Sequence, residues 1–95
     1  MDVVVTYDIR TADPAGQRRL ARVAAVCERY GSRVQYSVFE CRLDDVLLQK
    51  LISELLEEID RRVDSVNIYR LGLAFENARE SIGTRGMSWG DPWIV

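Results

Sequence analysis

The chain has 95 residues, of which 47% are hydrophobic and 29% are charged, a balance typical of one globular domain. It contains no histidine, which excludes a Ser-His-Asp triad, a Cys-His dyad and a His-ligated metal within one chain. The formal net charge of −2 argues against indiscriminate binding to nucleic acid. Residues 1–43, however, carry seven Arg against five acidic residues, so a local basic surface that binds phosphates is still possible.

The size of the chain favours self-association. A domain this short buries only about 60–65% of its unfolded surface, so we expect a homo-oligomer. No apolar run approaches the ~18 residues that a membrane span requires. The N-terminal sequence MDVVVTYDIR also lacks the basic start of a signal peptide. We therefore expect a cytoplasmic protein with no membrane partner.

Residues 2–9 are rich in β-branched and aromatic side chains, and their continuous valine run predicts a central strand buried on both faces. A helix should follow within residues 11–31, with Asp13 as N-cap, Pro14 at the first position and Gly31 as the stop. Its apolar stripe is Leu20, Val23, Ala24, Cys27 and Tyr30, and Arg18, Arg22 and Arg29 occupy the opposite face.

Residues 33–43 are expected to be extended, but their alternation breaks near residues 37–39. One bent strand and a tight hairpin both fit, and no Gly or Pro decides between them. A second helix is predicted from Asp44 or Asp45 to Arg62, with two i,i+4 ion pairs on its outer face, Glu57–Arg61 and Glu58–Arg62. A last strand over residues 65–71 ends at Gly72.

The remaining residues, 73–95, differ in character. Residues 81–90 hold three glycines, whereas Trp89 and residues 93–95 are apolar and need a surface to cover. We favour docking on a partner chain over docking on the same chain. The chain thus divides into a folded domain, residues 1–72, and a dimerisation segment, residues 73–95. Cys27 and Cys41 lack CxxC spacing and lie in apolar patterns, so we interpret them as packing thiols.

The element order predicts an α+β fold, a ferredoxin-like βαββαβ sandwich with both helices on one face of an antiparallel sheet. The other face would be a dimer surface. Asp8, at the end of the central strand, would then suit a hard cation such as Mg²⁺, provided that a second carboxylate meets it across a dimer axis. The alternative is that Asp8 caps the turn into the first helix.

Basic and polar side chains surround this position. Arg18, Arg22 and Arg29 could follow a phosphate backbone, joined by Arg10 and Arg33, or could form a solvated helix face. Ser37 would position a phosphate or water, or make a local turn hydrogen bond. Tyr7 and Tyr36 would stack on bases or pack in the core or an interface, and Phe39 would pack.

Four segments in this order and spacing resemble one family: TYDI, RRLARVAAVCERYG, SRVQYSVFECRLD and SVNIYRLG. They are similar, over about residues 1–72, to the small CRISPR-associated adaptation nucleases, the second of the Cas proteins. The tail IGTRGMSWGDPWIV resembles members that accompany type I-C systems.

The resemblance implies a symmetric homodimer in which the C-terminal segment of each chain adds a strand to its partner's sheet. It implies that two copies of Asp8 share Mg²⁺ and that Arg19, Arg22 and Arg33 bind nucleic acid, with Ser37 and Phe39 matching the family's SVF element. Members are metal-dependent endonucleases on single-stranded RNA or double-stranded DNA. The family also has a second role, in which the dimer bridges a DNA fragment between two dimers of the adaptation integrase.

Three hypotheses follow. The first is a Mg²⁺-dependent endonuclease with Asp8 at the metal and arginines on the phosphates. The second is a non-catalytic scaffold dimer that spans DNA and docks the integrase. The third is a small-molecule regulatory domain, since a ferredoxin-like scaffold does not by itself fix function.

Overall fold

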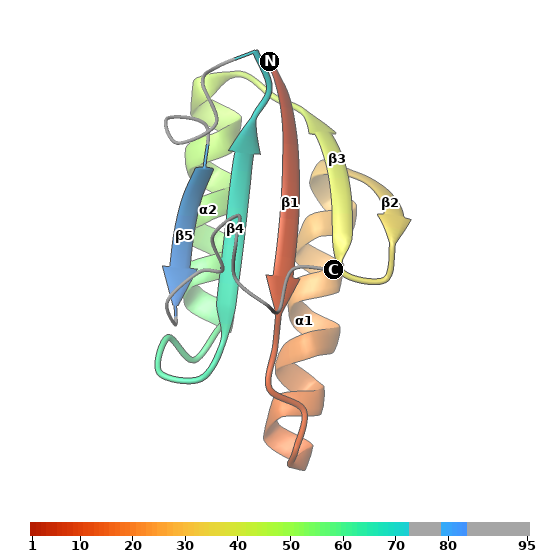
Figure 1. Ribbon diagram of the computed structural model, residues 1–95, viewed down its shortest axis with the longest axis vertical. Helices are drawn as coiled ribbons and strands as arrows, with labels where there is room; N and C mark the ends of the chain where they lie inside the picture. The colour runs from red at the N-terminus through yellow and green to blue at the C-terminus, as the bar shows by residue number, and fades with distance from the viewer. Residues whose placement is uncertain (73–78, 84–95) are drawn as a thin grey trace, which may run out of the picture.

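A five-stranded antiparallel sheet with two helices on one face forms this chain, as the computed structural model shows for residues 1–72 and 79–83 (Figure 1). The strands lie in the order β2-β3-β1-β4-β5. The ferredoxin-like βαββαβ arrangement predicted from the sequence is confirmed, with β5 as an additional edge strand. The elements in chain order are β1 (Asp2–Asp8), α1 (Pro14–Tyr30), β2 (Gly31–Gln35), β3 (Val38–Arg42), α2 (Asp45–Glu58), β4 (Ser65–Arg70) and β5 (Arg79–Gly83).

Strand β1 is the centre of the sheet, because it pairs with β3 on one side and β4 on the other. Val5 lies opposite both Phe39 and Ile68, and all three point toward the helices and are fully buried. The alternate residues Val4 and Thr6 face the other side and are only half-buried. Burial of β1 on both faces, as its valine run predicted, is therefore complete only on the helix side of the single chain.

Helix α1 begins as expected, with the Asp13 carboxylate accepting a hydrogen bond of 2.8 Å from the backbone N–H of Gly16. It ends at Gly31, which passes directly into β2 with an extended backbone, φ −165°. A Cβ on Gly31 would lie 2.3 Å from the carbonyl oxygen of Glu40. Glycine is thus needed here for close approach to β3 and not for a left-handed turn.

The segment 33–43 is a hairpin and not a bent strand. β2 and β3 are joined at Tyr36 and Ser37, with a register shift between Arg33 and Gln35. Tyr7 fixes the turn through two hydrogen bonds of 3.1 Å: its hydroxyl donates to the Tyr36 carbonyl and its backbone N–H to the Ser37 carbonyl. These contacts with β1 explain how the turn forms without glycine or proline.

Helix α2 ends earlier than predicted, at Glu58 and not at Arg62. The chain turns at Ile59, which has an extended backbone and a buried side chain. Arg62 then binds Asp60, with Nε and Oδ1 3.1 Å apart. The expected i,i+4 pairs at Arg61 and Arg62 were therefore wrong, because neither arginine is helical.

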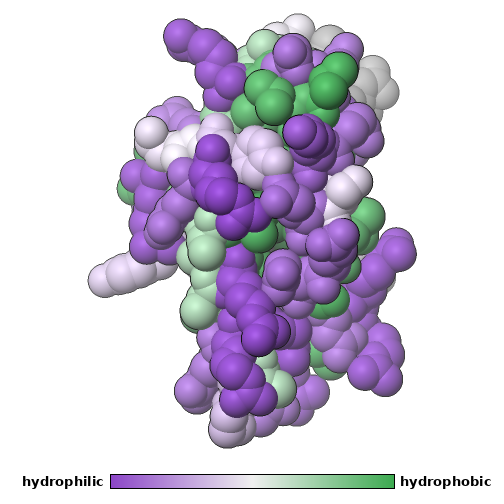
Figure 2. All heavy atoms as spheres, turned by 180° about the vertical axis from the view of Figure 1, so that it is seen from behind, coloured by the Kyte–Doolittle hydropathy of each residue, from purple (hydrophilic) through white to green (hydrophobic). Residues whose placement is uncertain are grey.

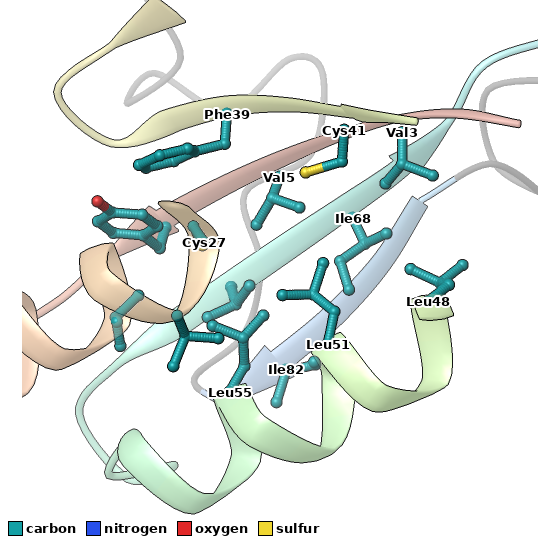
Figure 3. Packing of buried hydrophobic residues seen from close by; sticks show 14 of the residues in the cluster. Val3, Val5, Cys27, Phe39, Cys41, Leu48, Leu51, Leu55, Ile68 and Ile82 are labelled. Atoms are coloured by element: carbon teal, nitrogen blue, oxygen red, sulfur yellow. The ribbon is translucent and has the colours of Figure 1, made fainter. Parts of the chain in front are cut away.

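The core fills the space between the sheet and the helices (Figure 3). Cys27 and Cys41 are buried and free, which confirms their interpretation as packing thiols. Burial raises the pKa of Cys27 to about 12, so this thiol stays protonated at neutral pH. The largest fully buried side chains include Phe39, Leu48, Leu51, Leu55, Ile68, Val3 and Val5.

Strand β5 lies within the segment expected to dock on a partner chain, and it pairs with β4 of its own chain, with Ile82 opposite Val66. The rest of that segment, including Trp89 and residues 93–95, lies outside the described residues. In the described part of the chain, no helix is long and apolar enough to cross a membrane.

Candidate functional site

Asp8 is the last residue of β1, opposite Ser65 of β4, and its side chain is exposed. The strand's alternation places it on the sheet face away from the helices, in line with Val4 and Thr6. Among the described residues, no cation pairs with its carboxylate. The alternative role, capping the first helix, belongs to Asp13. Asp8 therefore presents a carboxylate that no described cation binds, at the end of the central strand, which is hydrogen-bonded on both sides.

A surface hollow of about 460 Å³ adjoins Asp8. Arg33 and Ser37 of the β2–β3 hairpin line it, together with Tyr36 and, from α1, Gln17. The hairpin turn and the end of β1 lie at the same end of the sheet (Figure 1). The fold thus brings three of the predicted site residues, Asp8, Arg33 and Ser37, to one hollow from distant parts of the sequence.

The aromatic residues under this hollow orient Arg33. Its guanidinium lies over the ring of Phe39, 5.1 Å from the centroid, and 3.6 Å from the carboxylate of Glu28. Phe39 is fully buried, so its predicted packing role is confirmed. Tyr7 is also buried and stacks on Phe39 with centroids 6.2 Å apart, which makes it a core residue and not a base-stacking one. Burial raises the pKa of Tyr7, so its hydroxyl remains the donor to the hairpin turn.

The arginines predicted to bind nucleic acid divide into two groups. Arg10, Arg18 and Arg22 are exposed, and no carboxylate within the described ranges pairs with their side chains. Arg19, in contrast, donates from Nε to the buried carboxylate of Asp64 at 2.8 Å. Arg29 binds Glu54 of α2 at 2.6 Å. Hydrophilic residues cover most of the helix side of the molecule, with small hydrophobic patches between them (Figure 2).

Asp64 is the residue that sequence reasoning missed. Its side chain has no solvent exposure, and it accepts hydrogen bonds from the backbone N–H groups of Arg10, at 3.0 Å, and Asp60, at 2.8 Å. Burial alone would raise the pKa of this carboxyl, but the hydrogen bonds from Arg19 and the two N–H groups outweigh it and hold the pKa below its ordinary value. A charged residue directly before an apolar strand was the available signal.

The residues present fit a hard cation only in part. Carboxylate and hydroxyl oxygens are ligands that Mg²⁺ prefers, and Asp8 supplies one such group. No cluster of three or more potential metal-ligating side chains occurs within the residues described, 1–72 and 79–83. A cation at Asp8 would thus need a second carboxylate that these residues do not place beside it.

Comparison with known proteins identifies the family. Residues 1–75 match the family model described as CRISPR associated protein Cas2. The chain belongs to the Cas2 family. The resemblance found in the YD and SVF elements is thereby confirmed, and it covers the whole ferredoxin-like domain.

Individual Cas2 proteins extend the similarity beyond this domain. The CRISPR-associated endoribonuclease Cas2 of Chlorobaculum tepidum is 48% identical over 85 residues, covering 90% of this chain and 88% of the relative. The CRISPR-associated endonuclease Cas2 of Halalkalibacterium halodurans is 46% identical over 95 residues and 99% of both chains. The crystal structure of Streptococcus pyogenes Cas2 at pH 6.5 superposes with a TM-score of 0.71 at 42% identity, covering 87% of this chain and 100% of that one.

Proposed function

We propose that this Cas2-family protein is a Mg²⁺-dependent endonuclease of CRISPR adaptation that hydrolyses phosphodiester bonds of double-stranded DNA or single-stranded RNA. The observation that carries the proposal is the carboxylate of Asp8, which is exposed and unpaired within residues 1–72 and 79–83 and adjoins a hollow that Arg33 and Ser37 also line. The names of the relatives, which include both an endoribonuclease and an endonuclease, support the same reaction class.

The active form in this proposal is a homodimer that brings two copies of Asp8 together. No helix of the described residues lies over the sheet face that carries Asp8 (Figure 1), and the central residues of this face, Val4, Thr6 and Val38, are half-buried. Packing two such faces would remove this partly apolar surface from water. It would also supply the second carboxylate that the metal requires.

Each side chain at the hollow then has a definite task. Bound Mg²⁺ would supply a Lewis acid and lower the pKa of water, so the chemistry needs no histidine. Asp8 would hold the metal, and Arg33, oriented by the Phe39 ring, would bind a phosphate oxygen. The Ser37 hydroxyl would donate a hydrogen bond to the same group, and exposed Arg10 would add positive charge at the strand end.

The deciding experiment compares wild type with Asp8→Asn on duplex DNA and single-stranded RNA, each with Mg²⁺ and with EDTA. Asp13→Asn is the matched control, because it also removes an exposed carboxylate nearby but keeps an N-cap residue. We expect cleavage by wild type and Asp13→Asn in Mg²⁺ only, and none by Asp8→Asn. Equal activity of all three, or activity that persists in EDTA, rejects the metal-nuclease proposal.

A second candidate is the DNA-bridging scaffold that docks the adaptation integrase. The exposed pair Arg18 and Arg22, four residues apart on one face of α1, favours it because their charges are free for phosphates within the described structure. Under this proposal Asp8→Asn leaves spacer capture intact, whereas charge reversal at Arg18 and Arg22 abolishes it. A spacer-acquisition assay in cells with these variants separates the two functions.

A further inference from the structure

Tyr36, at the tip of the β2–β3 hairpin, is 93% exposed, the highest value among the large hydrophobic side chains that the structure describes. Tyrosine ordinarily buries much of its ring, so a ring held in solvent is unusual. No hydrogen bond within the described residues involves its hydroxyl. In the part of the chain that the structure describes, the ring is therefore open to contact with a ligand.

The backbone that carries this ring is fixed. The Tyr36 carbonyl accepts a hydrogen bond from the Tyr7 hydroxyl, and the next carbonyl, of Ser37, accepts one from the Tyr7 backbone N–H, both at 3.1 Å. Tyr7 is in turn buried against Phe39. A ring on an anchored turn loses little backbone entropy when it binds, which suits a recognition platform.

Two hollows meet at Tyr36. One, of about 460 Å³, is the hollow that holds Asp8, Arg33 and Ser37. The other, of about 700 Å³, is lined by residues 33–37. A flat group placed against the ring would thus have open space on either side of the hairpin. Arg33 and Ser37 line both hollows, so a ligand on the ring would lie next to them.

Flat aromatic rings next to a guanidinium are the chemistry that binds an unpaired nucleotide. A base stacks on the aromatic face while its phosphate meets the cation. Bases inside a duplex are already stacked on their neighbours and would have to be unstacked first. A tyrosine platform at this position therefore discriminates between paired and unpaired strands, whatever their sequence.

We propose that Tyr36 is a base-stacking residue that makes the Asp8 hollow prefer single-stranded nucleic acid over duplex. The proposal deepens the proposed function by naming the substrate class of the same hollow. It requires binding but no cleavage, so it can fail or succeed independently of the metal chemistry at Asp8.

The test measures binding in EDTA, where cleavage plays no part, with a short oligouridine RNA strand and a short duplex DNA as probes. The proteins are wild type, Tyr36→Phe, which keeps the ring, and Tyr36→Leu, which keeps apolar bulk without it. Val46→Ala, at another exposed hydrophobic on α2, is the surface control. We expect Tyr36→Leu to weaken single-strand binding by about 5- to 150-fold, the equivalent of about 1–3 kcal/mol per stacked base, with duplex binding unchanged.

A double-mutant cycle identifies stacking itself. RNA strands with one abasic position each are bound to wild type and to Tyr36→Leu. At the stacked position, loss of the base and loss of the ring should not be additive, because each removes the same contact. Tyr36→Phe should behave like wild type in both measurements.

Four outcomes would overturn the proposal. These are no single-strand binding by wild type, an equal loss of single-strand and duplex affinity in Tyr36→Leu, additivity at every abasic position, and dissociation of Tyr36→Leu protomers in sedimentation. The last outcome would place the ring in a contact between copies of the chain.

Discussion

Arg19 and Asp64 form an ion pair between helix α1 and the residue before β4, with Nε and Oδ2 2.8 Å apart. The Arg19 side chain is 17% exposed and that of Asp64 is fully buried. Since Asp64 also accepts from the Arg10 and Asp60 N–H groups, one carboxylate joins the exit of β1, α1 and the α2–β4 turn. Arg19 therefore stabilises the fold through Asp64, whereas the sequence suggested only a role in binding phosphates.

Removing the cation should cost much stability. Arg19→Met leaves the Asp64 charge with its two backbone N–H donors but without its cation, so we expect a clear decrease in the free energy of unfolding. Arg18→Met, one position earlier and exposed, should change it by less than about 0.5 kcal/mol. Urea unfolding followed by circular dichroism measures both. Similar midpoints for the two variants would contradict a structural role for the pair.

The lowered pKa of Asp64 also sets a pH dependence. Because its folded pKa lies below the unfolded value of about 3.9, Asp64 stabilises the fold above that pH and loses this contribution as the pH falls through the folded pKa. Asp60, whose pKa the Arg62 side chain lowers to about 2, acts in the same direction. We expect the wild-type unfolding free energy to decrease between about pH 4 and 2.

Asp64→Asn tests the source of this decrease. The variant should be less stable at neutral pH, since the amide cannot replace the carboxylate, yet its stability should fall less steeply across the acid range. Unfolding midpoints at a series of pH values give the two slopes. Parallel curves for variant and wild type would show that other carboxyl groups cause the acid sensitivity.

The exposed arginines of α1 should control the salt dependence of DNA binding. Arg18→Gln and Arg22→Gln are each expected to reduce the slope of log affinity against log salt by about 0.9, the value for one phosphate contact on duplex DNA. Arg29→Gln should leave the slope unchanged, because Glu54 already neutralises that charge. Fluorescence anisotropy titrations over a range of salt concentrations provide the slopes. A reduction for Arg29→Gln equal to the others would mean that α1 has no preferred face.

At Gly16 we expect the effect of an alanine substitution on stability to be opposite to that predicted by helix propensity. Glycine-to-alanine changes inside a helix normally stabilise by about 1 kcal/mol. A Cβ on Gly16 would lie 1.9 Å from the carbonyl oxygen of Arg10, so we expect Gly16→Ala to destabilise instead. Ala25→Gly, at an exposed position of the same helix, should cost the ordinary ~1 kcal/mol. A thermal midpoint of Gly16→Ala at or above wild type would reject the close approach.

Local sequence patterns predicted most of the fold because they act over a few residues. The Asp13 cap, the Pro14 start and the valine run of β1 each specify their element without help from distant residues. The end of α2 was misplaced because its stop depends on turn contacts at Asp60 and on the burial of Ile59. The hairpin stayed undecided for the same reason, since Tyr7, 29 positions from Tyr36, secures its turn.

The site followed a similar division. Asp8 and Arg33 could be named from motif and charge, and the fold places both at one hollow. The sequence could not predict that Arg18 is exposed while Arg19 is paired, because only the tertiary structure brings Asp64 to one of these two adjacent arginines. The exposure of Tyr36 and the burial of Tyr7 were likewise open, since two tyrosines in apolar segments look alike in sequence.

The central position of β1 has a consequence for how the site withstands local opening. Fraying of a sheet starts at edge strands, which here are β2 and β5, whereas β1 is hydrogen-bonded on both sides. The carboxylate of Asp8 is thus attached to the strand that we expect to separate last. The hairpin that carries Arg33 and Tyr36 is tied to this same strand by the two hydrogen bonds from Tyr7, so both sides of the site depend on β1 for their positions.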